Sequence, residues 1–342
     1  MELFESFGVL LLLAVALLIT VVGTKAFHSF ALTRGIIANP NFRSLHQHPI
    51  PRGGGIVFSL VFISAAIGLW LETSIDPNLM RAIILGGAVA TLSGLVDDVV
   101  QIAARTKLVI QGILAAWVLF CFGGEPLYDL QWTPVFVDLA FSWFALVWLM
   151  NLYNFMDGID GMAASGAIFI CVASIIALLL AGHGDKSLIL IFGLLAICTF
   201  GFLLFNRPPA SIFMGDSGSL FLGYCFGALI TKTVTGGEIS LWTWLILFGY
   251  FAGDTTTTTV LRIFLTKRWY GAHRSNAYQN LARIWDSHIK VVRGVSLYHV
   301  LWLFPLAIWS ILMPSTAPLA ALFALAPVIF WTYHYGPRLS SS

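Results

Sequence analysis

The stretch "FVDLAFSWFALVWLMNLYNFMDGIDGMA", residues 136–163, indicates how the rest of the chain is to be interpreted. Its first half is almost entirely apolar, whereas its second half contains two carboxylates, Asp157 and Asp160, each followed by a glycine. A further apolar run, "AIFICVASIIALLL", begins at residue 167. Charged groups at the border of the hydrocarbon region are costly and usually functional. The pattern therefore predicts two membrane-spanning helices joined by a polar turn with a functional role.

The composition excludes an ordinary water-soluble protein. The chain has 342 residues, of which 58% are hydrophobic and 10% charged, and its mean hydropathy is +0.89. A soluble domain carries about 25% charged residues, so most of this exterior must face lipid. Because Glu2 and Glu5 precede the first apolar run, we expect that run to be a retained span and not a cleaved leader. Four cysteines lie in or beside apolar runs, where they act as small apolar side chains: Cys121, Cys171, Cys198 and Cys225.

The apolar runs predict an all-α integral membrane protein with no soluble domain. Roughly 20 apolar residues cross a bilayer as a helix, and this rule gives about eleven spans. The runs are long and continuous, which favours helices over the short alternating strands of a barrel. The expected spans lie near residues 7–24, 54–71, 81–96, 107–123, 135–152, 161–181, 187–205, 218–232, 239–260, 295–313 and 317–334.

The basic residues predict the orientation. Most of the eighteen lysines and arginines fall in one set of loops, and such loops face the cytoplasm. We therefore expect the N-terminus on the outer side of the membrane and the C-terminus in the cytoplasm. The same loops hold the unusual polar motifs, which places the active site on the cytoplasmic face. The expected cytoplasmic loops span residues 25–53, 97–106, 153–160, 206–217 and 262–294.

Five aspartates gather in these loops or at the adjoining helix ends. Any one of them could be an ordinary helix cap. Adjacent Asp97 and Asp98, however, repel unless a cation or basic group compensates, and Asp157 and Asp160, spaced i and i+3, would share one face of a helical turn. Together with Asp216, they suit a hard cation such as Mg²⁺, or Mn²⁺, that also binds a phosphate substrate. Zinc is a poor match, because no Cys or His pair has its ligand spacing.

Basic and aromatic side chains on the same side could hold an anionic ligand. The "RGGG" segment at 52–55 could form an anion-binding nest or a flexible start of a helix. Phe213 and Tyr153 could stack on a base or anchor the protein at the interface. Asp254, within a span, could belong to the site or orient the basic loop that follows. No nucleic-acid partner is expected. The candidates for a diphosphate site are His46, His48, Arg52, Arg105, Lys107, His273 and Arg274.

At this point the chain resembles a known family, the polyprenyl-phosphate N-acetylhexosamine-1-phosphate transferases. The resemblance runs over nearly the whole chain and rests on six motifs in order. These are "RGGG" (52–55), "GLVDD" (94–98), "AARTKL" (103–108), "NLYNFMDGIDGMA" (151–163), "IFMGDSGSLFLG" (212–223) and "AHRSNAYQNL" (272–281).

The resemblance implies Mg²⁺-dependent transfer of a HexNAc-1-phosphate, of the GlcNAc type, from a UDP-sugar to undecaprenyl phosphate, with release of UMP. Within the family the chain resembles the branch that starts O-antigen and related envelope glycans. This resemblance implies the inner membrane of a bacterium, with the N-terminus in the periplasm. The phospho-MurNAc-pentapeptide transferases carry three consecutive histidines where this chain has "HRSN", so they rank second. A transporter or flippase is the alternative from a different class. Relatives often pair in the membrane, so a homodimer is possible.

The resemblance also implies roles for particular residues. Asp97 and Asp98 match paired aspartates near the metal and the lipid phosphate, Asp216 matches the main Mg²⁺ ligand, which Asp98 assists, and Lys107 matches a basic residue at the phosphate site. The expected catalytic residues are Asp97, Asp98, Lys107 and His273, and Asp98 could act as a base, as a nucleophile or only as a residue of the metal and phosphate site. Two departures are Gln101, where some relatives have a third acid, and Asn276, where a second histidine is common. The remaining matches are to nucleotide-sugar binding: Asn151, Asn154, Asp157 and Asp160 around the nucleotide, Phe213 under the uracil, and Arg52, His273 and Arg274 at the sugar diphosphate.

Overall fold

The computed structural model describes residues 2–38, 49–73, 75–128, 133–266 and 274–339. The described part of the chain is all-α, as the sequence predicts, apart from two strands of two residues each, β1 (Ile37–Ala38) and β2 (Ile50–Pro51). The helices are α1 (Glu2–Arg34), α2 (Gly55–Glu72), α3 (Pro77–Arg81), α4 (Gly87–Val100), α5 (Ala104–Cys121), α6 (Val135–Met156), α7 (Met162–Leu180), α8 (Lys186–Asn206), α9 (Asp216–Thr235), α10 (Leu241–Leu247), α11 (Gly249–Leu265), α12 (Ala277–Ile284), α13 (His288–Tyr298), α14 (Phe304–Leu312) and α15 (Ala317–Tyr335).

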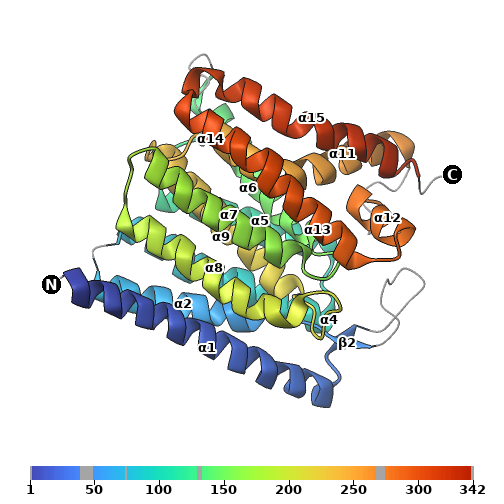
Figure 1. The fold of residues 1–342 in the computed structure, drawn as a ribbon, viewed down its shortest axis with the longest axis horizontal. Coiled ribbons are helices and arrows are strands. Elements are labelled where there is room, and N and C mark those ends of the chain that lie inside the picture. The colour runs from blue at the N-terminus through green and yellow to red at the C-terminus, as the bar shows by residue number, and fades with distance from the viewer. Residues whose placement is uncertain (1, 39–48, 74, 129–132, 267–273, 340–342) are drawn as a thin grey trace.

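The long helices pack side by side in one bundle (Figure 1). Two π-helical turns, at Ala82–Gly86 and His299–Leu303, join α3 to α4 and α13 to α14, so each pair forms one long helix. The N-terminus lies at one end of the bundle, whereas β2, α12 and the C-terminus lie at the other. The motifs noted in the sequence converge on this second end.

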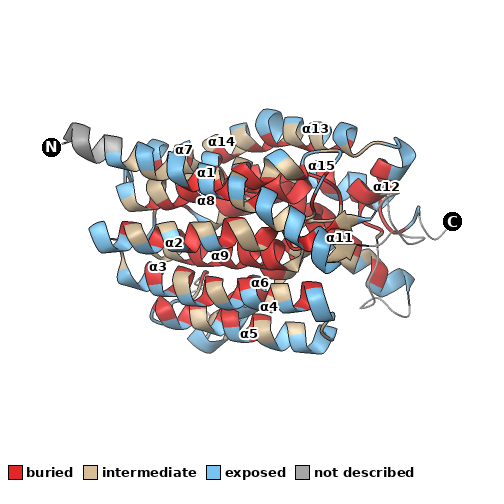
Figure 2. Cartoon of the chain, turned by 90° about the horizontal axis from the view of Figure 1, so that it is seen from below, coloured by how far each residue is buried: buried red, intermediate tan, exposed pale blue. Residues whose placement is uncertain are grey.

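Helix α9 lies at the centre of the bundle and contacts α2, α4, α5 and α6. Nearly all of its residues are buried, while the outer helices expose much of their surface (Figure 2). Glycines allow the close packing: a Cβ at Gly218 would lie 2.8 Å from the Cα of Gly55, and one at Gly223 would lie 2.8 Å from the Cα of Met150. A helix enclosed in this way needs no lipid-facing side chains, which explains its small and polar residues.

Nine helical segments of the described chain are long and apolar enough to cross a membrane. The other two expected spans, 218–232 and 239–260, fall on α9 and on α10 with α11. Those helices are richer in glycine, threonine and other polar residues. The structure therefore supports a multi-pass membrane protein, while the number eleven and the orientation stay predictions.

Several helices run further than expected. Helix α1 continues to Arg34, so it includes part of the expected loop 25–53, and α4 continues to Val100, so Asp97 and Asp98 lie in its last turn. Helix α6 ends at Met156. The prediction that Asp157 and Asp160 share a helical face is therefore wrong: the segment between α6 and α7 is a turn, in which Gly161 has a φ of +76°.

Candidate active site

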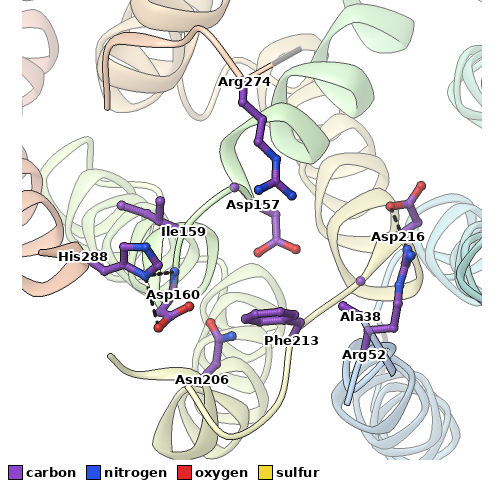
Figure 3. A pocket seen from close by; sticks show the side chains of 12 residues that line it. Ala38, Arg52, Asp157, Ile159, Asp160, Asn206, Phe213, Asp216, Arg274 and His288 are labelled. Carbon is purple, nitrogen blue, oxygen red and sulfur yellow. Dashed lines mark hydrogen bonds and ion pairs between the residues drawn. The ribbon is translucent and has the colours of Figure 1, made fainter. Parts of the chain in front are cut away.

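A pocket of about 260 Å³ opens at the end of the bundle where the motifs converge (Figure 3). Its lining mixes acidic, basic and aromatic side chains from segments far apart in the sequence. Six of the residues predicted from the sequence lie in this lining: Arg52, Asp157, Asp160, Phe213, Asp216 and Arg274.

The β-strands and the adjoining loop bring Arg52 to the pocket. Strands β1 and β2 pair in antiparallel fashion. The N–H of Phe213 donates to the carbonyl of Pro51 at 2.8 Å, and the N–H of Gly54 donates to the carbonyl of Phe213 at 3.0 Å. The "RGGG" segment is thus hydrogen bonded along the segment that leads into α9. This backbone pairing fixes Arg52 and Phe213 beside one another.

Aspartates and basic side chains alternate in space beside the pocket. Arg52 donates to Asp98 through Nη2 at 2.6 Å and through Nε at 3.1 Å. Lys107 forms ion pairs with Asp97 and with Asp216, the latter at 2.8 Å. The sequence predicted that the adjacent aspartates would require basic compensation, and this is confirmed. Both cations lie where they can also attract a phosphate.

Asp98 has a structural task in addition. Its carboxylate accepts the backbone N–H of Asp216 at 2.9 Å and that of Ser217 at 3.1 Å, and its side chain has no exposed surface. These amides begin α9, so a residue of α4 satisfies the N-terminus of the central helix. A Cβ at Gly215, whose φ is +76°, would overlap the Asp98 carboxylate. Glycine is required here for Asp98 to hold Asp216 at the pocket.

Asn151 and Asn154 act between helices. Asn154 donates to Ser219 of α9 at 3.0 Å, and Asn151 donates to Gln111 of α5 at 2.7 Å. Neither side chain is among the described residues that line the pocket. These hydrogen bonds hold α6 against its neighbours, and the contact of both residues with a nucleotide stays a prediction.

Asp157 and Asp160 line the pocket but have different surroundings. Asp160 accepts the backbone N–H of Ala210 at 3.0 Å and lies 3.2 Å from Nδ1 of His288. Burial raises the pKa of Asp157 well above its usual range, and the nearby carboxylates of Asp216 and Asp98 raise it further. Asp160 thus secures the turn, whereas Asp157 presents its carboxyl group to the pocket (Figure 3).

The two aromatic candidates for base stacking, Phe213 and Tyr153, lie in different surroundings. Phe213 lines the pocket. The prediction that Tyr153 could stack on a base is wrong, because its side chain has no exposed surface. Its hydroxyl donates to the carbonyl of Ala163 at 2.9 Å, and its ring stacks on Phe226. It belongs to the apolar core.

Two lining residues with polar side chains were missed by the sequence analysis. Asn206 accepts the N–H of Gly161 at 3.0 Å and donates to the carbonyl of Ile212 at 3.0 Å, so it ties the turn to the segment that leads to Phe213. His288 begins α13 and pairs with Asp160. The pattern "FNRPPAS", which marks the end of a helix, could have drawn attention to Asn206; no local signal marks His288.

Three predicted histidines, His46, His48 and His273, lie outside the described residues. Arg105 is exposed and is not among the described lining residues. Arg274 does line the pocket. The four cysteines are buried and not bonded to one another, in agreement with their interpretation as apolar side chains.

The carboxylates at the pocket are ligands of the type that a hard cation prefers, but they do not form a complete coordination shell. Within the described part of the chain, no group of three or more His, Cys, Asp or Glu side chains is arranged to hold a metal ion, so the expected convergence of five carboxylates on one ion is not found. Carboxylate oxygens of Asp157 and Asp216 do face the pocket. Mg²⁺ commonly uses one or two carboxylates and completes its shell with water and substrate phosphates. The residues present fit that arrangement.

Comparison with known proteins gives a consistent set of relatives. The family model described as glycosyl transferase family 4 matches residues 80–234. A probable undecaprenyl-phosphate N-acetylglucosaminyl 1-phosphate transferase of Bacillus subtilis (strain 168) is 31% identical over 288 residues, which cover 80% of this chain and 77% of that protein.

Two further relatives extend the comparison. A decaprenyl-phosphate N-acetylglucosaminephosphotransferase of Mycolicibacterium smegmatis is 32% identical over 249 residues, covering 66% of this chain and 59% of that protein. A phospho-N-acetylmuramoyl-pentapeptide-transferase of Streptococcus pneumoniae (serotype 2, strain D39) is 29% identical over 264 residues, covering 71% of this chain and 77% of that protein.

Proposed function

Because the chain belongs to the polyprenyl-phosphate N-acetylhexosamine-1-phosphate transferases of glycosyl transferase family 4 and is therefore a phosphosugar transferase, we propose that it transfers GlcNAc-1-phosphate, or a close HexNAc analogue, from a UDP-sugar to undecaprenyl phosphate. UMP is the second product. The reaction takes place at the cytoplasmic face of a bacterial inner membrane and starts an O-antigen or a related envelope glycan.

The observation that supports this proposal best is the composition of the pocket. Phe213 offers a flat apolar surface, Arg52 and Arg274 offer positive charge, and Asp216 and Asp157 offer oxygens to a hard cation. A nucleoside diphosphate-sugar needs these three features together, since it carries a base, two phosphates and the cation that accompanies them. The pocket also lies at one end of the bundle, where a soluble donor and a lipid headgroup can meet.

Mg²⁺, or Mn²⁺, is part of the proposal. Asp216 would be its principal protein ligand, with Asp98 behind it, because Asp98 fixes the N-terminus of α9 from which Asp216 projects. When bound, the ion would neutralise phosphate charge and orient the diphosphate. Asp157 is the second carboxyl group that faces the same space.

The chain's own residues supply positioning and charge stabilisation. An oxygen of the lipid phosphate attacks the β-phosphorus of the UDP-sugar, the new P–O bond forms, and the bond to the bridging oxygen breaks as UMP leaves. Lys107 and Arg52 stabilise negative charge on the phosphates. A phosphate monoester is largely ionised near neutral pH, so no strong base is required. Asp97 holds the side chain of Lys107 in place, and Asp98 holds that of Arg52.

The test is release of UMP from a defined mixture. Purified protein in detergent with Mg²⁺, undecaprenyl phosphate and one UDP-sugar at a time is expected to release UMP with UDP-GlcNAc or with the GalNAc, FucNAc or QuiNAc analogue. Omitting either the lipid or Mg²⁺ should abolish release. Absence of UMP with every UDP-sugar would contradict the proposal.

A second candidate substrate is UDP-MurNAc-pentapeptide, because of the match to the pneumococcal pentapeptide transferase. Against it stands "HRSN" at 273–276 in place of three histidines. Adding this donor to the same panel decides between the two branches, since each would release UMP with its own donor only.

A further inference from the structure

Asp254 is a charged residue of the bundle interior for which the reaction above has no use. It lies in α11, is 0% exposed, and is not among the described residues of the pocket lining. Its carboxylate accepts the backbone N–H of Ala277 at 2.9 Å and that of Tyr278 at 3.2 Å. These are the first two amides of α12, which have no acceptor within their own helix. A residue of α11 therefore caps α12.

The same carboxylate connects a third helix. Thr258 of α11 and Thr332 of α15 each donate a hydroxyl to Oδ1 of Asp254 at 3.2 Å. From α12, Asn280 donates to the carbonyls of Tyr335 and Gly336, at 2.7 and 2.9 Å, where α15 ends. An eight-residue helix is not stable by itself, so these contacts hold α12 in place.

Helix α12 in turn contacts the pocket. The hydroxyl of Tyr278 donates to the carbonyl of Phe155 at 2.7 Å, in the last turn of α6 and two residues before Asp157. A Cβ at Gly158 would overlap the Tyr278 hydroxyl, so the turn lies directly against α12. Arg274, at the pocket, lies two residues before the N-cap of α12. The two flanks of the pocket thus depend on the position of one short helix.

We propose that Asp254 is a positioning residue for the donor side of the pocket. By capping α12 from within α11, it fixes where Arg274 and the turn that carries Asp157 stand relative to each other. Asp254 then governs binding of the nucleotide-sugar, not the rate of the chemical step. The kinetic part of this proposal rests on the proposed UDP-sugar donor.

The kinetic test is Asp254→Asn, which keeps the size of the side chain but turns an NH₂ group toward backbone donors. We expect the KM for the UDP-sugar to rise about tenfold, the scale of a disrupted buried hydrogen-bond set. The kcat and the KM for undecaprenyl phosphate should stay within about twofold. The matched control is Thr255→Val, since Thr255 is equally buried and its hydroxyl has no hydrogen-bond partner among the described residues. A fall in kcat with an unchanged donor KM would overturn the proposal.

A second variant keeps the proposal testable if Asp254→Asn folds poorly. Tyr278→Phe removes only the hydroxyl that bonds to Phe155, and we expect a smaller rise in the donor KM, about threefold. If both residues act through α12, the double variant should show less than the product of the two single effects. Multiplicative effects would contradict a shared path.

Hydrogen exchange tests the proposal without any donor. In the free protein, Asp254→Asn should speed amide exchange at residues 275–284 and 155–161, whereas Thr255→Val should not. Unchanged exchange in both segments would refute the cap. If the variant shows faster exchange but the wild-type protein releases no UMP from any UDP-sugar, the capping role of Asp254 is supported and the proposed UDP-sugar donor is contradicted.

Discussion

On one side of the pocket, Asp98 and Asp216 lie beside Arg52 and Lys107, whereas on the other side Asp157 and Asp160 lie in the turn between α6 and α7. We call the first group, with Asp97, the charged wall. The second group, residues 157–161 with Asn206 and His288, is the turn wall. Both walls are built around aspartates, but the carboxylates of the two walls have different partners.

In the charged wall, basic side chains compensate the carboxylates over long distances in sequence. Lys107 and Asp216 are 109 residues apart, and Asp98 and the amide of Asp216 are 118 apart. In the turn wall, a backbone amide and His288 hold Asp160, and burial keeps the pKa of Asp157 raised. From this contrast we expect the charged wall to handle most of the phosphate and metal charge of the proposed reaction. The turn wall would shape the space for the donor and add the carboxyl group of Asp157.

The largest effect is expected at the point where the charged wall meets the pocket. Asp216→Asn should lower the rate at least about 100-fold, the scale of losing a central charge-stabilising group. Membrane insertion should be intact. The measurement is UMP release by the purified variant at saturating Mg²⁺. Asp185→Asn, an exposed N-cap at the start of α8, is the matched control and should retain wild-type activity. Near-normal turnover of Asp216→Asn would remove Asp216 from the metal site.

The second-largest loss of activity is expected for Lys107→Met. It removes the lysine that pairs with both Asp97 and Asp216, so these two carboxylates lose their shared counter-charge and Arg52, 4.0 Å from Asp216, remains beside them. We expect kcat to fall roughly tenfold to 100-fold, because a charge-stabilising group at the phosphates is lost. Lys107→Arg should recover part of the rate, as it restores the charge with a different shape. Equal activity of the Met and Arg variants would show that the charge of Lys107 plays no part.

The two walls also differ in how far the sequence predicted them. Adjacent Asp97 and Asp98 required basic neighbours by charge alone, and the structure supplies Lys107 and Arg52. The turn wall was predicted less well. Spacing suggested that Asp157 and Asp160 share a helical face, but α6 ends at Met156 and α7 begins at Met162, so both aspartates lie in the turn between them.

Partners that come from distant segments leave no local mark in the sequence. His288 pairs with Asp160 across 128 residues, and only the packing of α13 brings them together. The same limit applies to the aromatic residues, because Tyr153 and Phe213 look alike as stacking candidates until the fold places one of them in the core. Burial of α9 likewise depends on its neighbours, so hydropathy alone is a weak guide to that helix.

Phe213 lies between the two walls and tests the nucleotide end of the pocket. Phe213→Ala should raise the KM for the UDP-sugar about tenfold, since stacking of a base on an aromatic ring contributes about 1–3 kcal/mol. The inhibition constant of UMP should rise by the same factor, because UMP carries the same base. Phe213→Tyr should restore both constants. An unchanged UMP constant in the Ala variant would place the base elsewhere.

The smallest effect is expected in the turn wall. His288→Gln removes the pair with Asp160, but the amide of Ala210 still donates to that carboxylate. A partly exposed pair contributes about 1 kcal/mol or less, so the donor KM should rise no more than about fivefold, with kcat unchanged. Steady-state kinetics with each substrate varied in turn would measure this. If His288→Gln lowered kcat as far as Asp216→Asn does, the turn wall would take part in the chemistry, and the division of labour between the two walls would be wrong.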